Sequence, residues 1–168
     1  MDTARRGFLL GKKNTLPARR PPWSLVEEEF TRQCTRCGDC IAQCPVRILS
    51  IGDGGFPTVS FADAGCTLCG DCARACSSGA IAMADGGRPW PWTATIDARC
   101  LAREGVVCRS CSEACETGAI RFKPQPGGVS LPHLDASRCT GCGACLAPCP
   151  GGAITLQERP IAEPEVST

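Results

Sequence analysis

The sequence predicts an α+β protein made of two tandem small domains, in which short strands and short helices surround cysteine-rich loops. Three observations lead to this prediction. One cysteine spacing occurs four times in 168 residues, and all 16 cysteines belong to these runs. The tripeptide Gly-Ala-Ile follows three of the four runs. Aromatic residues are few, with 5 Phe, 3 Trp and no Tyr, so side chains alone provide little material for a core.

The last run shows the spacing most clearly. It places four cysteines and a following proline at Cys139, Cys142, Cys145, Cys149 and Pro150. This C-x₂-C-x₂-C-x₃-C-P pattern is the one by which bacterial ferredoxins hold [4Fe–4S] clusters. Three thiolates at steps of three residues can surround three irons of one cubane, and the fourth points to a different cluster. Gly141 and Gly143 allow the backbone to pass close to a bulky inorganic core.

The other three runs repeat this spacing. The first consists of Cys34, Cys37, Cys40 and Cys44, followed by Pro45. The second consists of Cys66, Cys69, Cys72 and Cys76. The third has seven residues in its first gap and consists of Cys100, Cys108, Cys111 and Cys115. Because no cysteine is left over, the sequence predicts four [4Fe–4S] clusters.

Two other uses of cysteine fit the pattern less well. Disulfides require an oxidising compartment and are typical of smaller secreted chains. Structural zinc sites favour pairs of C-x₂-C hooks separated by a longer loop, which differs from three cysteines in consecutive steps. A Rieske centre requires two histidines, and His133 is the only histidine, so we expect it on the surface of a strand.

Four runs form two pairs, and each pair defines a domain. We place the first ferredoxin-like domain at residues 30–88 and the second at 89–156, with a basic N-terminal arm at 1–29 and a C-terminal tail at 157–168. Domains of this size bury little surface. The clusters therefore act as the core, and we expect the iron-free chain to be largely unfolded.

Within the first domain, the helices and strands follow the cysteine runs. Short helices are expected at 38–44 and 72–76, each stopped soon after the fourth cysteine. Strands are expected at 46–51, 58–61 and 80–83, with a glycine-rich turn at 52–55. A turn-rich linker at 85–92 leads to the second domain. Its Trp90 and Trp92 either cover the domains or form an exposed aromatic patch.

The second domain repeats this order. A strand at 95–97 precedes the third run, and residues 101–107 lengthen the loop of that run. A short helix is expected at 111–115 and further strands at 119–123, 129–134 and 153–156. The residues Gly79, Gly118 and Gly152 stand where the chain after a run must turn into a strand.

The N-terminal arm carries most of the local positive charge. Its segment Ala4-Arg5-Arg6-Gly7-Phe8-Leu9-Leu10 is similar to a twin-arginine export motif, but Gly-Lys-Lys follows instead of an apolar region. The arm is therefore expected to stay on the protein, either as a solvated tail or as a docking arm for a partner protein. Trp23, after two prolines, either pins the arm or packs on its own domain.

Charge and hydropathy narrow the function classes. The formal charge is +1, and four clusters of about −2 each lower the charge of the loaded protein to about −7, which disfavours nucleic-acid binding. No run of 18 apolar residues is present, so no transmembrane segment is expected. Abundant unpaired cysteine indicates a reducing cytoplasm.

Resemblance to paired-motif ferredoxins implies a ligand assignment in which the fourth cysteine of each run serves the other run's cluster. Cluster one then takes Cys34, Cys37, Cys40 and Cys76, and cluster two takes Cys66, Cys69, Cys72 and Cys44. Cluster three takes Cys100, Cys108, Cys111 and Cys149, and cluster four takes Cys139, Cys142, Cys145 and Cys115. A competing assignment keeps each run to its own cluster.

Over nearly its whole length, the chain resembles the ferredoxin-type NapF proteins of the periplasmic nitrate reductase system. The discriminating features are Ala4-Arg5-Arg6-Gly7, Arg20-Pro21-Pro22-Trp23 and the widened third run. The resemblance implies a cytoplasmic protein with four [4Fe–4S] clusters. It also implies an interaction with the catalytic subunit, NapA, before export, in which the protein assists maturation.

Two alternative functions are compatible with this resemblance. The first is an accessory protein that assists the NapA precursor by electron or iron–sulfur transfer. The second is a general low-potential electron carrier for other redox partners. A cluster with four thiolate ligands has no open iron, and the sequence contains no Gly-rich nucleotide loop, so no catalytic residues and no enzyme activity are expected.

Overall fold

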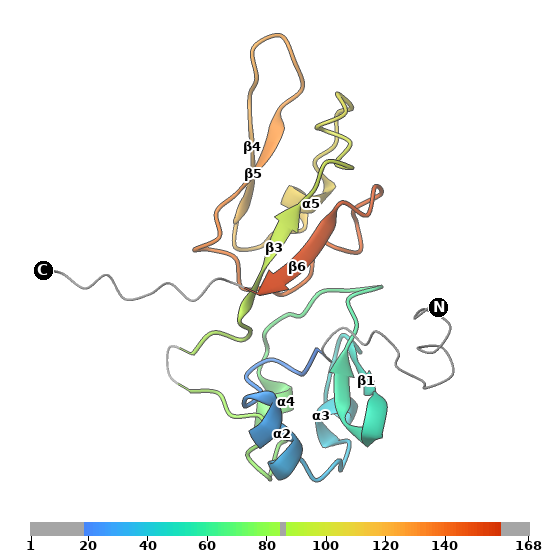
Figure 1. Ribbon diagram of the computed structural model, residues 1–168, viewed down its shortest axis with the longest axis vertical. Coiled ribbons are helices and arrows are strands. Elements are labelled where there is room, and N and C mark those ends of the chain that lie inside the picture. The colour runs from blue at the N-terminus through green and yellow to red at the C-terminus, as the bar shows by residue number, and fades with distance from the viewer. Residues whose placement is uncertain (1–18, 85–86, 159–168) are drawn as a thin grey trace, which may run out of the picture.

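The computed structural model describes residues 19–84 and 87–158. Figure 1 shows two bodies stacked along the longest axis: the lower contains α2, α3, α4 and β1, and the upper contains α5 and β3 to β6. We call them domain 1 and domain 2. All 16 cysteines lie among the described residues and are thiols. Within these residues no helix is long and apolar enough to cross a membrane.

Domain 1 is built from short elements around the first two cysteine runs. Its elements are α2 (Glu27–Gln33), α3 (Asp39–Ala42), β1 (Leu49–Ile51), the 3₁₀ turn η1 (Asp53–Gly55), β2 (Pro57–Val59) and α4 (Asp71–Arg74). β1 and β2 form an antiparallel hairpin, with Leu49 opposite Val59. The predicted helices and hairpin are therefore present. The strand predicted at 80–83 is reduced to one antiparallel bridge between Ser24 and Ile81.

The chain is packed on domain 1 from Arg19 onward, including residues 19–29 that we assigned to the arm. The Val59 amide donates a 2.8 Å hydrogen bond to the Arg19 carbonyl, and Pro21 is fully buried. Helix α2 was not anticipated. It starts with three glutamates, which favour a helix N-terminus, and it buries Phe30. Residues 1–18, with the twin-arginine-like segment, lie outside the described residues.

Domain 2 contains two antiparallel strand pairs. Its elements are β3 (Trp92–Ile96), α5 (Ser110–Glu113), β4 (Ile120–Lys123), β5 (Leu131–Leu134) and β6 (Ile154–Glu158). β3 pairs with β6 over five residues, and β4 pairs with β5. Alternate residues of the first pair, such as Ala94, Ile154 and Leu156, are buried beneath the sheet. His133 is exposed on β5, as predicted.

The turn after each run has the same geometry. The third residue after the fourth cysteine has positive φ in all four runs: 53° at Arg47, 74° at Gly79, 59° at Gly118 and 54° at Gly152. Three glycines adopt this left-handed conformation without strain, and Arg47 adopts it in the first run. The turn sends the chain from the cysteine loop into the segment that follows it.

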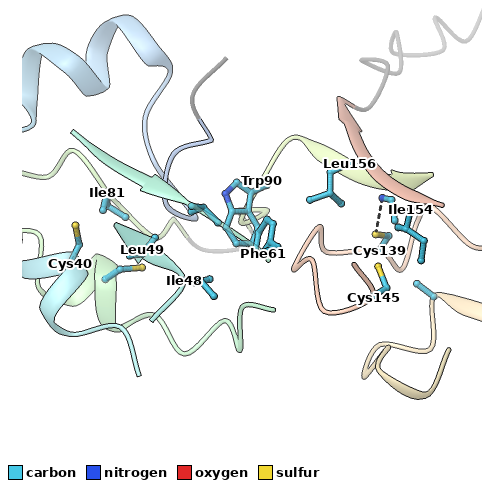
Figure 2. Close-up of a cluster of buried hydrophobic side chains, with 14 of the residues drawn as sticks. Cys40, Ile48, Leu49, Phe61, Ile81, Trp90, Cys139, Cys145, Ile154 and Leu156 are labelled. Carbon is cyan, nitrogen blue, oxygen red and sulfur yellow. Dashed lines mark hydrogen bonds between the residues drawn. The ribbon is translucent and has the colours of Figure 1, made fainter. Parts of the chain in front are cut away.

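Trp90 lies between the two domains. It is 4% exposed, and its ring makes an edge-on contact with Phe61 at 5.7 Å and stacks on Trp92 at 5.3 Å. Its Nε1 donates a 3.0 Å hydrogen bond to the Arg20 carbonyl. Figure 2 shows Trp90 and Phe61 between the buried groups of the two domains. Trp90 therefore covers the domains and does not form an exposed patch.

Candidate iron–sulfur sites

The sixteen cysteines line four separate cavities, which we call sites 1 to 4. Each cavity contains three cysteines from one run and the fourth cysteine of its neighbour. Site 1 is lined by Cys34, Cys37, Cys40 and Cys76, and site 2 by Cys66, Cys69, Cys72 and Cys44. Site 3 is lined by Cys100, Cys108, Cys111 and Cys149, and site 4 by Cys139, Cys142, Cys145 and Cys115.

This grouping is the one that the crossed ligand assignment predicts. The competing assignment would bring Cys44 to site 1, but Cys44 lines site 2 and Cys76 takes its place. In domain 2, Cys115 and Cys149 exchange in the same way. The crossing ties the two runs of each domain together, because each cavity is complete only when both runs are folded.

Backbone conformation curls the loops around these cavities. The second residue after the first cysteine has positive φ in three runs: 60° at Arg36, 56° at Leu68 and 76° at Gly141. In site 2 this curl lets the Leu68 amide donate to the Cys66 sulfur at 3.3 Å. Such amides stabilise a thiolate more than a thiol, because they donate to the charged form.

Amides from the segments after the runs also reach cysteine sulfurs. Ile81 donates to Cys76 at 3.3 Å, and Ala153 donates to Cys149 at 3.4 Å. The amide of Ala94, in β3, lies 3.5 Å from the Cys139 sulfur, the contact dashed in Figure 2. The segments after the runs and strand β3 therefore provide donors to the cysteines as well as walls to the cavities.

The third cysteine of each run is buried, and its pKa is raised. The pKa is raised to about 11 for Cys40 and Cys111, and to about 12 for Cys72 and Cys145. Burial is the main cause, followed by repulsion from the other cysteines of the site. Four thiolates are therefore unfavourable together without compensating positive charge, which is what bound iron supplies.

The fourth cysteine of the third run, Cys115, differs from these buried cysteines, because its pKa is lowered. Burial raises it, but a hydrogen bond from the Thr117 hydroxyl and bonds from the amides of Ile120, Ala119 and Gly118 lower it by more. Site 4 thus has one cysteine whose surroundings favour the thiolate before any metal is bound.

A buried hydroxyl in site 4 also fits an anionic cluster. Thr140 lines the cavity, and its Oγ1 is buried without a hydrogen-bond partner among the described residues. A cluster with sulfide and thiolate acceptors would satisfy this donor. Within the described part of the chain, no three His, Cys, Asp or Glu side chains converge as they would on a single ion. The cysteines instead surround a space, as a multi-iron core requires.

Solvent exposure differs between the sites. Cys37 in site 1 and Cys69 in site 2 are exposed, whereas their counterparts Cys108 and Cys142 are half-buried. Apolar side chains close the remaining walls, including Ile81 in site 1 and Phe122 in site 3. Sites 3 and 4 are therefore more enclosed than sites 1 and 2, and burial and hydrogen bonding are among the factors that tune a cluster's potential.

The widened third run still brings its first cysteine to a site. Residues 101–107 form a compact turn in which Ala102 is buried and the Val106 amide bonds to the Leu101 carbonyl at 2.8 Å. Cys100 lines site 3 beside Cys108 despite the longer gap. Val107, by contrast, is 79% exposed at the surface.

Thr140 and Arg88 contribute to site 4 without being predicted from the sequence. Thr140 belongs to a repeat that was visible, since a threonine follows the first cysteine at Thr35, Thr67 and Thr140. Arg88 donates to the Cys139 carbonyl across 51 positions of sequence, and no local pattern signals such a contact.

The class of protein follows from its similarity to a known domain family. The 4Fe-4S dicluster domain matches residues 33–80 and 106–162, which include every cysteine except Cys100. This chain is therefore an iron–sulfur protein of the ferredoxin type, with a dicluster segment in each half.

Relatives then define the family. The chain is 44% identical to the ferredoxin-type protein NapF of Haemophilus influenzae over 92% of its own length and 93% of that protein. It is 42% identical to the ferredoxin-type protein NapF of Escherichia coli K12 over 94% and 96%. A methylamine utilization ferredoxin-type protein MauM of Methylophilus methylotrophus is 34% identical over 77% of this chain. The chain belongs to the ferredoxin-type NapF family.

Proposed function

We propose that this protein holds four [4Fe–4S] clusters in sites 1 to 4. We further propose that it is an accessory protein without enzyme activity of its own. In this role it binds the cytoplasmic precursor of NapA, the catalytic subunit of periplasmic nitrate reductase. It then assists maturation before export by electron or iron–sulfur transfer.

The observation that carries the proposal is the set of four cavities, each lined by four cysteines. Four thiolates complete the ligands of a cubane, so no iron is left open to bind a substrate. The chemistry available to such a site is the gain or loss of one electron, or release of the cluster itself. This supports a role toward another protein rather than catalysis on a small molecule.

Charge supports a protein partner. The basic residues Arg5, Arg6, Lys12 and Lys13 precede a body that becomes anionic when four clusters of about −2 each are bound. A basic arm on an anionic body can orient a partner that carries both signs of charge. The sixteen thiols are consistent with a reducing compartment, where a precursor waits before export.

The test uses the full chain, reconstituted anaerobically, to capture the NapA precursor. Loaded protein should contain about sixteen irons. We expect Arg5→Gln with Arg6→Gln to weaken capture at least fivefold. The matched control is Lys12→Gln with Lys13→Gln, which removes the same charge from the same arm. Equal capture by both variants would contradict a specific role of the arginine pair. The test substitutes individual residues and does not delete residues 1–22, because Pro21 is buried in domain 1 and its removal would disturb that domain.

The general electron carrier is the second candidate, and the exposed Cys37 and Cys69 favour it. An exposed ligand brings the cluster edge near the surface, where varied partners can approach. This function predicts fast reduction of several unrelated acceptors and no stable complex with the NapA precursor. Failure to capture the precursor together with such broad reactivity would replace the maturation proposal.

A further inference from the structure

The two domains meet at their cysteine loops. The amide of Cys66, in site 2, donates a 2.8 Å hydrogen bond to the carbonyl of Cys142, in site 4. One candidate ligand from each domain is thus joined through a single backbone hydrogen bond. We call the contact between Gly65–Cys66 and Gly141–Ala144 the junction.

Two glycines allow this close approach. A Cβ added at Gly65 would lie 2.4 Å from the Cα of Ala144 and 2.6 Å from its amide nitrogen. A Cβ added at Gly143 would lie 2.4 Å from the Phe61 ring. Both contacts run from one domain to the other. A side chain at either position would therefore push the two cysteine loops apart.

Surrounding contacts hold the junction closed. Trp90 and Phe61 pack beside it and are both at most 5% exposed, so water is excluded on that side (Figure 2). The Arg88 guanidinium bonds the Cys139 carbonyl in site 4. A cation at this place offsets part of the repulsion between two anionic sites. Packing and charge therefore both stabilise the contact between sites 2 and 4.

Within each domain the two sites are also adjacent. Cys40 of site 1 and Cys44 of site 2 flank the end of α3, and Cys72 and Cys76 flank the end of α4. Four residues of helix rise only about 6 Å. In domain 2, the pairs Cys111 with Cys115 and Cys145 with Cys149 separate sites 3 and 4 by the same number of residues.

We propose that the junction is an electron-transfer bridge that makes the four sites one path in the order 1, 2, 4, 3. The inference rests on the proposed four clusters. With clusters bound, one electron would pass from the reduced cluster of site 2 to the oxidised cluster of site 4, so that site 2 would lose one electron and site 4 would gain it. No bond forms or breaks and no proton is required. The initial electron comes from an external one-electron reductant, which is dithionite in the test.

This path gives the protein two functional ends. Site 1 lies at one end, near the exposed Ile51, and site 3 lies at the other, near the exposed Val106 and Val107. An electron that enters domain 1 can then leave from domain 2 without crossing solvent. Two independent ferredoxin domains on a linker would not provide this.

The test opens the junction and leaves the cysteines unchanged. Gly65→Ala introduces the clash with Ala144, and Gly128→Ala is the matched control, since its added Cβ meets nothing nearer than 3.9 Å. Both variants are reconstituted, and iron is counted. In the dithionite-reduced protein, EPR measures magnetic coupling between clusters. Pulse radiolysis at substoichiometric reduction measures the rate of redistribution of the electron.

We expect Gly65→Ala to keep about sixteen irons but to lose the component of the EPR splitting that arises across the junction. We also expect its redistribution rate to fall at least tenfold, with Gly128→Ala like the wild type. If Gly65→Ala matches Gly128→Ala in spectrum and rate, the bridge is overturned. A wild type with far fewer irons would instead contradict the proposed four clusters.

A second pair of variants covers the case in which Gly65→Ala loses iron. Gly143→Ala opens the junction from domain 2 by meeting Phe61, and Gly127→Ala is its control at positive φ with nothing within 4 Å of the added Cβ. The bridge is supported if Gly143→Ala loses the magnetic coupling and the fast redistribution of the electron while Gly127→Ala keeps both. Equal behaviour of this pair at full iron content overturns it.

Discussion

In domain 2, strand β3 precedes the third cysteine run and strand β6 follows the fourth. These two strands pair over five residues. In domain 1, the same two positions in the chain make only the bridge between Ser24 and Ile81. Nevertheless, both domains bring their eight cysteines into the same crossed pattern. A long strand ladder is therefore not what places the cysteines.

Domain 1 compensates with contacts from its N-terminal segment. Arg20 pairs with Glu27 at 2.6 Å and lies over the rings of Phe30 at 5.0 Å and Phe56 at 5.2 Å. These contacts fix α2 just before the first run. Side-chain packing thus replaces strand pairing where the chain before the first run forms only a bridge.

Two features shared by both domains are local, namely the spacing of the runs and the left-handed turn three residues after the fourth cysteine. The third shared feature, the crossed fourth cysteine, joins the two runs of each domain. The sites therefore depend on these shared features, whereas the strands around them can vary. Four experiments test this contrast between the domains.

Removing iron should have the largest effect. Because binding free energy of the metal is also folding free energy, we expect both domains to lose most of their structure on anaerobic chelation. The amides of the β3–β6 pair should keep the most residual protection, because this is the longest ladder described. Far-UV circular dichroism and hydrogen exchange measure the two effects. A native-like spectrum without iron would contradict the prediction, and equal exchange in both domains would contradict the contrast between them.

Paired cysteine substitutions test the crossing in domain 1. Cys44→Ser and Cys69→Ser should each damage only site 2, so the double variant should keep about three intact clusters. Cys44→Ser with Cys37→Ser should damage sites 1 and 2 and keep about two. Mössbauer spectroscopy counts the intact clusters. If each run serves its own cluster, the two double variants exchange results. The same test with Cys149, Cys111 and Cys145 shows whether domain 2 behaves alike.

Truncating Trp90 should destabilise the boundary between the domains. Trp90→Ala removes a buried ring and should cost about 3–5 kcal/mol, seen as faster loss of the visible cluster absorbance in denaturant. Trp90→Phe keeps a ring but removes the bond to the Arg20 carbonyl, and it should cost about 1 kcal/mol. Trp92→Ala is the comparison, since Trp92 is only half-buried. An effect of Trp90→Ala no larger than that of Trp92→Ala would show that the boundary does not depend on Trp90.

The smallest expected effect concerns the Arg20–Glu27 pair of domain 1. The hydrogen bond and the charge of Arg20 lower the pKa of Glu27 below 4.5, although burial opposes this. A carboxyl group whose pKa is lower in the folded than in the unfolded chain stabilises the fold at pH values above the unfolded pKa. This contribution disappears as the pH falls through the folded pKa. Since Glu27 is 55% exposed, we expect less than about 1 kcal/mol.

Hydrogen exchange of α2 amides between pH 5.5 and 3.5 measures this contribution. Wild type should lose protection toward the lower pH, and Glu27→Gln should show lower protection with a weaker pH dependence. Glu28→Gln removes the same charge from the same turn and serves as the control. Identical pH profiles for both variants would show that the ion pair does not hold α2.

Much of each site was predictable because its determinants are close in sequence. The steps from Cys139 to Cys149 and the turn at Gly152 lie within fourteen residues, so spacing alone indicates the cofactor and the loop geometry. The hairpins were predicted for the same reason, since a turn such as 52–55 joins neighbouring strands. The crossed grouping followed from resemblance to paired-motif ferredoxins, because two runs at this spacing close around two sites.

The N-terminal segment shows where sequence reasoning failed. The sequence predicts a basic arm at Arg19, Arg20 and the two prolines that follow, because charge and proline are typical of unstructured segments. In the structure Pro21 is buried and Arg20 is neutralised by Glu27. The segment folds because it meets partners that are distant in sequence, such as the Phe56 ring beside Arg20 and the Trp90 indole that donates to the Arg20 carbonyl.

By itself, the sequence therefore determined the iron–sulfur type of the cofactor and the local turns, since each is encoded over a few residues. Only the tertiary structure decided how the two domains meet. The bond from Cys66 to Cys142 joins residues 76 positions apart, and it depends on the absence of a side chain at Gly65 and Gly143. Contacts of this kind arise from the fit between two folded surfaces, and that fit has no short-range pattern in the chain.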